Sequence, residues 1–305
     1  MGRVGVDLYP EQTGLALDDV RSFAKSLGGS PTNVAVAAAR YGHSAAVITK
    51  VGEDPFGGYV RAALKGFGVD DAHVGTDPDL RTPIVFCELH PPDRFPLLFY
   101  REPKAPDMNL RAEDLDLDSI RRARIFWTTG TGLSDEPSRT ATLGALDVRD
   151  RSGITIHDLD YRPMFWKHPD EASMWQHRAL ERVSIAIGNL EECAVAVGEG
   201  SPSEMAERIL DLGVEVAVVK MGPAGVTAFS RGAVVSAAPV AVEVVNGLGA
   251  GDAFGGAVCH GLLEGWGWQE TIAFANAAGA YVAGQLACAD AMPTEEEVRR
   301  LMGEG

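Results

Sequence analysis

The fold follows from residues 244–256, which read VVNGLGAGDAFGG. This stretch begins as the apolar end of a strand, passes through glycines and continues as a helix. Apolar or small residues recur at positions 250, 253, 254, 257, 258, 261 and 262, which is the i, i+3, i+4 spacing of one helical face. Gly265 and Gly267 are expected to end the helix. The stretch therefore predicts a strand, a glycine turn and a helix in succession.

The glycine turn offers a binding site for an anion. The backbone N–H groups of Gly249, Ala250 and Gly251 are expected at the helix N-terminus, where glycine lets a ligand approach closely. Asp252 lies in the same turn, and a carboxylate there makes chemical sense if it takes a proton from a hydroxyl that attacks a phosphoryl group. A structural interpretation is equally compatible: Asp252 complements the helix dipole and the glycines allow tight packing. Neither a Walker A loop nor a dinucleotide-binding fingerprint fits the spacing.

Composition and charge narrow the function classes. The chain has 305 residues, 46% of them hydrophobic and 23% charged, which suits one large α/β domain or two small ones. The net charge of −16 argues against a general surface for nucleic acid or for an anionic membrane. No signal peptide and no apolar run of about 18 residues is evident. The four cysteines have no Cys-x-x-Cys spacing, so we expect buried thiols in a reducing cytoplasm.

Apolar strands alternate with helices along most of the chain. Strands are expected at 3–8, 45–51, 125–129, 154–158, 185–188 and 216–220. Helices are expected at 34–40, from the turn at 52–58 to about residue 67, at 269–287 and at 294–302. The last of these should begin with a capping box formed by Thr294 and Glu297. The alternation predicts a parallel sheet that is covered on both faces.

Residues 82–109 differ from this pattern. Two apolar runs, 83–89 and 95–101, are joined by a turn rich in proline, and no helix separates them. They should therefore pair antiparallel, as an inserted β flap.

Polar residues stand near the ends of the predicted strands, where ligands bind in open parallel sheets. They are Asp7, Gly52 and Asp54, Asp158, Asp160 and Arg162, Asn189 and Glu192, Lys220 and Gly222, and the turn from Gly249 to Asp252. These residues also have structural interpretations. Asp7 could cap a turn, and Asn189 and Glu192 could cap the helix that follows them. Lys220 could be the solvated end of a strand. Their shared position is what indicates a binding site.

The chemistry that this set suggests is phosphoryl transfer. Asn189 and Glu192 could hold Mg²⁺ through its water molecules, since Mg²⁺ takes few protein ligands directly. Lys220 and the helix N-terminus would meet phosphates, and Asp252 would accept the hydroxyl proton. The seven histidines are scattered in the sequence, and no metal is assigned to them.

Two motifs resemble the ribokinase-like (PfkB) carbohydrate kinases. Gly28-Gly29, Asn33, Gly42 and Gly52 fit the spacing of the N-terminal family signature, and residues 246–252 parallel the C-terminal signature Asp-Thr-x-Gly-Ala-Gly-Asp. The resemblance covers essentially the whole chain. It implies one kinase domain over residues 1–305, built as a three-layer α/β/α sandwich with a mainly parallel central sheet. A small β-sheet lid would come from about 8–28 and 82–109.

The resemblance also implies roles for matching residues. Asp252 would be the catalytic base, Gly249, Ala250 and Gly251 the anion hole, and Asp7, Gly29 and Asn33 the ligands of sugar hydroxyls. Asn189 and Glu192 would organise Mg²⁺ and phosphate, Lys220, Gly222 and Gly225 would lie along the ATP groove, and Asn276 near the adenine. Asn246 and Gly247 replace the usual Asp-Thr, so the resemblance does not carry the potassium (K⁺) dependence of many relatives over to this chain.

Within the family, residues 3–10, 99–107 and 158–166 are similar to members that phosphorylate 5-dehydro-2-deoxygluconate in inositol catabolism. Arg162, helped by Arg101 from the lid and with Asp160 close by, would hold the carboxylate of a sugar acid, because a guanidinium donates two parallel hydrogen bonds. Structural pairing of Arg162 with Asp158 or Asp160 remains open. A 2-keto-3-deoxygluconate kinase and a fructokinase are alternatives, and a non-catalytic sugar or nucleotide sensor is an alternative of another class. The implied state is a cytoplasmic homodimer joined through the lid.

Overall fold

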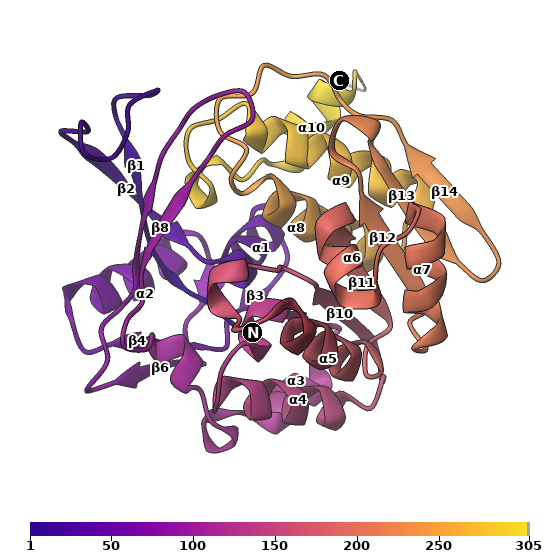
Figure 1. Cartoon of the computed structure of the whole chain (residues 1–305), viewed down its shortest axis with the longest axis horizontal. Helices are drawn as coiled ribbons and strands as arrows, with labels where there is room; N and C mark the ends of the chain where they lie inside the picture. The colour runs from indigo at the N-terminus through magenta and orange to yellow at the C-terminus, as the bar shows by residue number, and fades with distance from the viewer. Residues whose placement is uncertain (304–305) are drawn as a thin grey trace. The chain divides into compact units, whose positions relative to one another are not determined.

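The computed structural model describes residues 1–303 (Figure 1). The chain forms two compact units. Unit 1 comprises Met1–Gly2, Met108–Pro239 and Gly267–Ala273, and unit 2 comprises Arg3–Asp107, Val240–Trp266 and Phe274–Gly305. None of the described helices is both long and apolar enough to cross a bilayer.

Unit 1 is built on a six-stranded sheet with the order β14-β13-β12-β11-β10-β9. The four parallel strands are β9 (Ile125–Thr129), β10 (Ile154–Asp158), β11 (Ile185–Asn189) and β12 (Val216–Lys220), which agree with the predicted strands. They are almost wholly buried, as expected for parallel strands rich in valine and isoleucine.

The sequence prediction missed two antiparallel strands at one edge of this sheet. They are β13 (Val226–Ser230) and β14 (Val234–Ala237), which pair with each other and join the sheet at β12. Two apolar runs around Arg231-Gly232 were the signal for this hairpin.

Helices connect the parallel strands of unit 1, as crossover geometry requires. They are α4 (Ser138–Arg149), α5 (Pro169–Leu180), α6 (Leu190–Val197) and α7 (Pro202–Asp211), and α3 (Leu117–Arg122) precedes β9. α6 packs on β11 and β12, and α7 packs on β12 and β13. Both helices are drawn in front of the sheet in Figure 1. Short 3₁₀ turns, η1 to η6, lie at Pro106–Asn109, Ala112–Asp114, Gly130–Leu133, Pro163–Phe165, Gly222–Ala224 and Ala289–Ala291.

Unit 2 contains a four-stranded sheet with the order β2-β1-β7-β8. Its strands are β1 (Gly5–Pro10), β2 (Phe23–Gly28), β7 (Ile84–Cys87) and β8 (Leu97–Tyr100). β7 and β8 pair antiparallel as predicted for the flap, and β1 runs parallel to β7 and antiparallel to β2. The first predicted strand therefore belongs to this mixed sheet and extends to Pro10, so the expectation that Asp7 stands near the end of that strand was wrong.

The helices of unit 2 begin with α1 (Ser30–Arg40) and α2 (Pro55–Gly66) and end with α8 (Ala250–Glu264) and α10 (Glu295–Met302). α9 (Trp268–Ala283) has residues in both units. α1 packs against α8, and a Cβ added at Gly256 of α8 would collide with Ala37 of α1. The two helices therefore approach closely, which matters below because each carries a site residue.

Three local predictions can be checked in unit 2. The expected strand 45–51 is divided into β3 (Ala45–Ala46) and β4 (Thr49–Gly52), which pair with β5 (Val69–Asp70) and β6 (Val74–Asp77). The apolar stretch at 244–245 is not a strand, because the N–H groups of Val245 and Asn246 both donate to the carbonyl of Ala283. The capping box of Thr294 and Glu297 at α10 is confirmed.

Candidate functional site

The glycine turn in unit 2 leads directly into α8. Gly249 precedes the helix with φ +81°, a left-handed conformation that favours glycine. A Cβ at this position would lie 2.6 Å from the sulfur of Cys288, so the thiol fills the space behind the turn. The first N–H groups of a helix have no intrahelical acceptor, and this turn presents them without a side-chain cap. The arrangement can therefore bind an anion.

Asp252 lies in the first turn of α8 and is partly exposed. Asn33 of α1 donates from Nδ2 to Asp252 Oδ2 at 2.8 Å. Asn33 is only 3% exposed, and its Oδ1 is buried without a hydrogen-bond partner among residues 1–303. The close packing of α1 against α8 thus fixes the direction of the Asp252 carboxylate and leaves a polar group that lacks a donor.

The departure from the family signature at residues 246–247 has a local cause. Asn246 is fully buried, and its amide both donates to the carbonyl of Leu286 at 2.7 Å and accepts from the N–H of Leu248 at 3.0 Å. A carboxylate could not make the first of these bonds. A Cβ at Gly247 would lie 2.9 Å from the ring of Phe95, so glycine is favoured there.

Asp7 lies in the middle of β1, where Gly28 makes room for its side chain. A Cβ at Gly28 would collide with the Asp7 carboxylate, and a Cβ at Gly29, where φ is +105°, would collide with the Arg3 carbonyl. Burial raises the pKa of Asp7 to about 7, against the lowering effects of Arg3 and of the Tyr9 hydroxyl, and the Asp252 charge adds to the rise. The Gly28-Gly29 pair is thus explained by the packing of this carboxylate and of the β1 backbone.

The Tyr9 hydroxyl connects Asp7 with the glycine turn. It lies 3.3 Å from Asp7 Oδ2 and 2.7 Å from the Cys288 sulfur that stands behind Gly249. Sequence reasoning missed both Tyr9 and Cys288. Tyr9 could have been found because it is two residues from Asp7 and shares its face of β1, whereas nothing in the sequence relates Cys288 to Tyr9. All four cysteines are free and buried, as predicted.

We expect the free energy of unfolding to depend on pH through the titration of Asp7. Its carboxyl keeps its proton up to about pH 7 in the folded chain but loses it near pH 3.8 when unfolded, so stability falls as pH rises between these values. Asp7→Asn should therefore stabilise the protein by about 1–2 kcal/mol at pH 8, allowing for partial exposure, and much less at pH 4. Urea unfolding of both proteins at the two pH values measures the difference. A constant difference would show that Asp7 does not titrate in this range.

Unit 1 holds the second group of predicted residues, at the ends of β10 and β11. Asp160 is buried, with φ +29°, and accepts from the Thr131 hydroxyl at 2.7 Å. Its other oxygen lies 3.1 Å from Arg162 Nη2, so the structural pairing of Arg162 with Asp160 is present. Arg162 also has Nη1 3.9 Å from Glu192 Oε1, and its side chain stays 36% exposed. The guanidinium is thus held by two carboxylates and still reaches solvent.

Asn189 and Glu192 form a capping box at the start of α6. Asn189 Oδ1 accepts from the Glu192 N–H at 2.9 Å, and Glu192 Oε2 accepts from the Asn189 N–H at 2.7 Å. The capping interpretation of this pair is therefore confirmed. Glu192 Oε1 lies outside the capping box and faces Arg162 Nη1 at 3.9 Å, so a hydrated cation would share this oxygen with the guanidinium.

The remaining predicted residues have clear local positions. Lys220 ends β12, and Gly222 and Gly225 form the turn to β13, both with positive φ. A Cβ at Gly225 would collide with the Ala237 carbonyl, so the packing of this turn requires glycine at position 225. Asn276 lies on α9 and is partly exposed.

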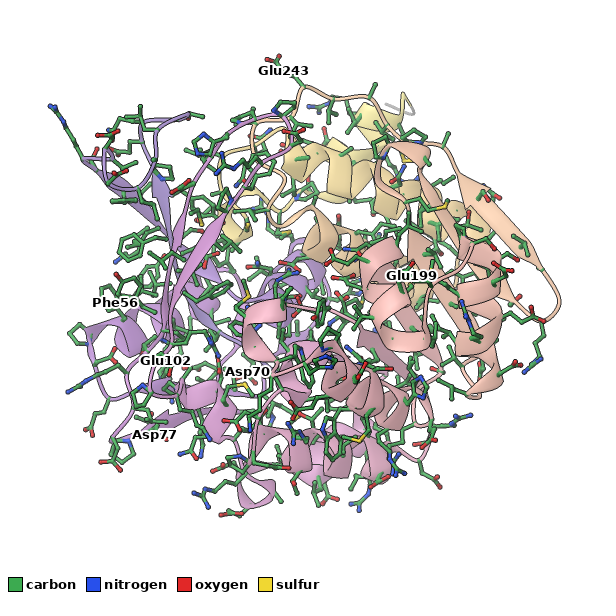
Figure 2. The ribbon with its side chains drawn as sticks, viewed as in Figure 1. Phe56, Asp70, Asp77, Glu102, Glu199 and Glu243 are labelled. Carbon is green, nitrogen blue, oxygen red and sulfur yellow. The ribbon has the colours of Figure 1, made fainter. Side chains whose placement is uncertain are left out.

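Asp107 and Asp54 both have structural partners within unit 2. The buried Asp107 forms an ion pair with Arg101, which was predicted to help bind a carboxylate, and it also accepts from the Val4 N–H at 3.0 Å. Asp54 caps α2 through the Gly57 N–H at 2.9 Å. Other acids, such as Glu199 and Glu243, are exposed (Figure 2).

Comparison with known proteins gives a consistent result. The family model described as pfkB family carbohydrate kinase matches residues 1–295. A 5-dehydro-2-deoxygluconokinase of Clostridium perfringens is 33% identical over 99% of this chain and 91% of its own. Two solved structures have a TM-score of 0.86: a PfkB protein from Polaromonas sp. JS666 (25% identity, 98% of this chain and 97% of that one) and a fructokinase from Vibrio cholerae O395 bound to fructose, ADP and calcium ion (28% identity, 98% and 96%). These similarities confirm the predicted ribokinase-like α/β fold.

Proposed function

Because the chain belongs to the pfkB family of carbohydrate kinases, we propose that it phosphorylates the terminal hydroxyl of 5-dehydro-2-deoxy-D-gluconate with ATP, giving the 6-phosphate, in myo-inositol catabolism. The observation that carries the choice of substrate is the similarity to the Clostridium perfringens 5-dehydro-2-deoxygluconokinase, which extends over nearly the whole chain. Arg162 supports it, because a plain sugar has no carboxylate to pair with this partly exposed guanidinium.

In the proposed reaction Asp252 is the base. Its carboxylate takes the proton of the sugar hydroxyl while that oxygen bonds to the γ-phosphorus and the bond from this phosphorus to ADP breaks. The N–H groups of Gly249, Ala250 and Gly251 stabilise the charge on the transferring phosphoryl group. Asn33 orients Asp252 through the 2.8 Å hydrogen bond, and a sugar hydroxyl supplies the donor that Asn33 Oδ1 lacks. Asp7 and the backbone at Gly29 bind further hydroxyls of the sugar.

ATP and Mg²⁺ are the proposed cosubstrate and cofactor. The ADP and calcium ion in the Vibrio cholerae fructokinase support a nucleotide and a divalent cation. Glu192 and Asn189 would hold Mg²⁺ through water, and the cation neutralises phosphate charge when bound. Lys220, Gly222 and Gly225 would line the nucleotide groove, with Asn276 near the adenine. Asn246 already uses its amide to close the turn, so no K⁺ requirement is proposed.

Arg162 is proposed to bind the carboxylate of the sugar acid. Arg162→Ala should raise KM for the sugar acid about 10- to 100-fold and leave KM for ATP nearly unchanged, because a charge-assisted pair is lost at a partly exposed group. Arg162→Lys is the matched control, since it keeps the charge but not the two-pronged geometry, and should recover part of the affinity. Steady-state kinetics with each substrate varied measure this. Equal effects on both KM values would indicate that Arg162 acts only through Asp160 and Glu192.

A substrate panel tests the proposed function itself. ATP turnover is measured with 5-dehydro-2-deoxygluconate, 2-keto-3-deoxygluconate and fructose. We expect the highest kcat/KM for the first. Preference for either of the others would replace the proposed substrate, and the absence of turnover with any of them would favour a sensor.

We further propose one kinase domain whose lid is built from about 8–28 and 82–109, and a cytoplasmic homodimer joined through that lid. The edge strand β8 supports this state, because Leu98 and Tyr100 are 47% and 61% exposed on it. Exposed apolar edge strands are commonly covered by a partner. Light scattering of the purified protein gives the mass that decides between monomer and dimer.

A further inference from the structure

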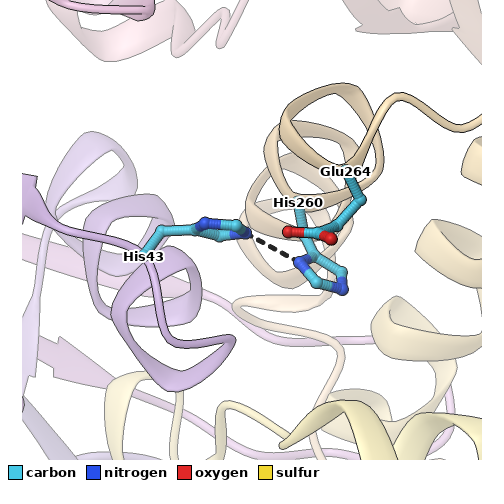
Figure 3. A group of neighbouring side chains, drawn as sticks. All are labelled: His43, His260 and Glu264. Carbon is cyan, nitrogen blue, oxygen red and sulfur yellow. Dashed lines mark hydrogen bonds between the residues drawn. The ribbon is translucent and has the colours of Figure 1, made fainter.

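Unit 2 contains a group of potential metal ligands that the proposed kinase reaction does not use. His43 follows the C-terminal end of α1, and His260 and Glu264 lie one turn apart near the C-terminal end of α8 (Figure 3). His43 Nε2 and His260 Nδ1 are 2.8 Å apart. One ligand atom from each of the three residues lies within 4.8 Å of the others. Residues that are scattered in the sequence are thus brought together by the packing of α1 on α8.

We propose that His43, His260 and Glu264 bind a divalent transition-metal ion of the zinc class. Two imidazole nitrogens and one carboxylate oxygen are a ligand set that Zn²⁺ accepts, with water in the fourth position. Tetrahedral ligands at about 2.05 Å place two nitrogens about 3.3 Å apart. The two rings therefore need to separate by only about half an ångström, and the ion then replaces the proton that they share.

His260 is the fixed member of this site. It is 2% exposed, its ring stacks on Tyr41 at 4.8 Å between centroids, and the edge of Trp266 meets it at 4.8 Å. Glu264 is exposed and His43 is partly exposed, so these two side chains can adjust to an ion. A buried anchor with two adjustable ligands is suited to capture a metal from solution.

The far side of His260 has the partner that a metal-bound histidine usually has. Its Nε2 makes no hydrogen bond within residues 1–303, but Glu295 Oε2 lies 3.5 Å away. Coordination through Nδ1 leaves the proton on Nε2, the nitrogen near this carboxylate, and a small movement of Glu295 would let the carboxylate accept it. Such partners strengthen metal binding.

The site is separate from the proposed catalytic residues. His260 follows Asp252 by eight residues, which is about 12 Å along α8. Asn33 and Asp252 lie near the N-terminal ends of α1 and α8, and their hydrogen bond joins the two helices there. A bound ion would join the C-terminal ends of the same two helices and would thus stabilise their pairing without touching substrate.

Titration with Co²⁺ tests the proposal, because tetrahedral Co²⁺ has strong visible absorption bands. The metal-free protein should bind one equivalent with these bands and show a higher Tm when Co²⁺ is present. His43→Gln and Glu264→Gln should each weaken binding at least about 10-fold, and Glu295→Gln should weaken it about 10- to 100-fold. His168→Gln is the control, since His168 lies beside Asp170 at 3.1 Å on an exposed surface of unit 1 and should leave binding unchanged.

The outcomes that overturn the proposal are equally specific. They are no Co²⁺ binding by the wild type, equal binding by the wild type and the double variant His43→Gln/Glu264→Gln, and charge-transfer bands of thiolate ligation. Both substitutions are at residues that are not fully buried, so circular dichroism is expected to confirm that the variants fold. Kinase turnover is not part of the readout, and the test is therefore independent of the proposed function.

Discussion

Asp252→Asn is expected to lower kcat about 10²- to 10⁴-fold, the range that a positioned general base contributes. The amide cannot accept the hydroxyl proton at neutral pH. The oxygen of the new side chain can still accept the hydrogen bond from Asn33 Nδ2, so the geometry at the start of α8 should be retained. KM for ATP and for the sugar acid should change little, because the lost interaction belongs to the transition state. Steady-state kinetics, together with Tm, measure the effect.

The competing explanation for Asp252 is that it complements the dipole of α8. Asp170→Asn is the matched control, because Asp170 is likewise an acid in the first turn of a helix, here α5. Loss of a dipole interaction costs about 0.3–1 kcal/mol of stability and no activity. If Asp252→Asn resembles Asp170→Asn, losing slight stability and keeping its kcat, the base assignment is wrong and the dipole interpretation stands.

Much of the fold could be predicted because its helices and strands follow from local hydrophobic patterns in the sequence. β9 to β12 are short stretches rich in isoleucine, valine and alanine that are separated by helical segments, and strands of this kind are expected where both faces of a sheet are buried. Their lengths were right to within a residue. The hairpin of β13 and β14 was missed because its runs are short and interrupted by polar residues. The apolar run at 244–245 was taken for a strand end, yet its backbone bonds to Ala283 at the end of α9, and such a partner cannot be inferred from local pattern.

In the candidate site, single residues could likewise be predicted from the sequence, whereas their partners from distant parts of the sequence could not. Asp252 was singled out from the glycine turn, Asn33 from the spacing of the N-terminal family signature, and Asp7 from its place near the end of a predicted strand. The distant partners were not found: Cys288 meets Tyr9 over a separation of 279 residues, and Arg162 meets Glu192 through the ends of β10 and α6. Such contacts depend on tertiary packing, which leaves no periodic signal in one sequence. His43 and His260 were dismissed for the same reason, because only the packing of α1 on α8 brings them together.

Gly249→Ala is the second substitution with a large expected effect. At φ +81° an alanine is strained, and its Cβ would lie 2.6 Å from the Cys288 sulfur and 2.8 Å from the Cys288 Cβ. Cys288 is buried, and the Tyr9 hydroxyl, which also reaches Asp7, is hydrogen-bonded to it. The turn rather than the thiol should therefore move. We expect kcat to fall at least about 100-fold, as when an oxyanion-hole donor is lost, and stability to fall by about 1–3 kcal/mol.

Gly265→Ala separates backbone strain from damage to the anion site. Gly265 ends the same helix in the same conformation, with φ +76°, and a Cβ there meets no atom of the described chain within 4 Å. It should cost about 1 kcal/mol in stability and leave kcat unchanged. Urea unfolding and steady-state kinetics on both variants give the comparison. Equal loss of activity in the two would mean that strain anywhere in α8 disables the enzyme, whereas loss confined to Gly249→Ala ties phosphoryl transfer to the N–H groups that this turn presents.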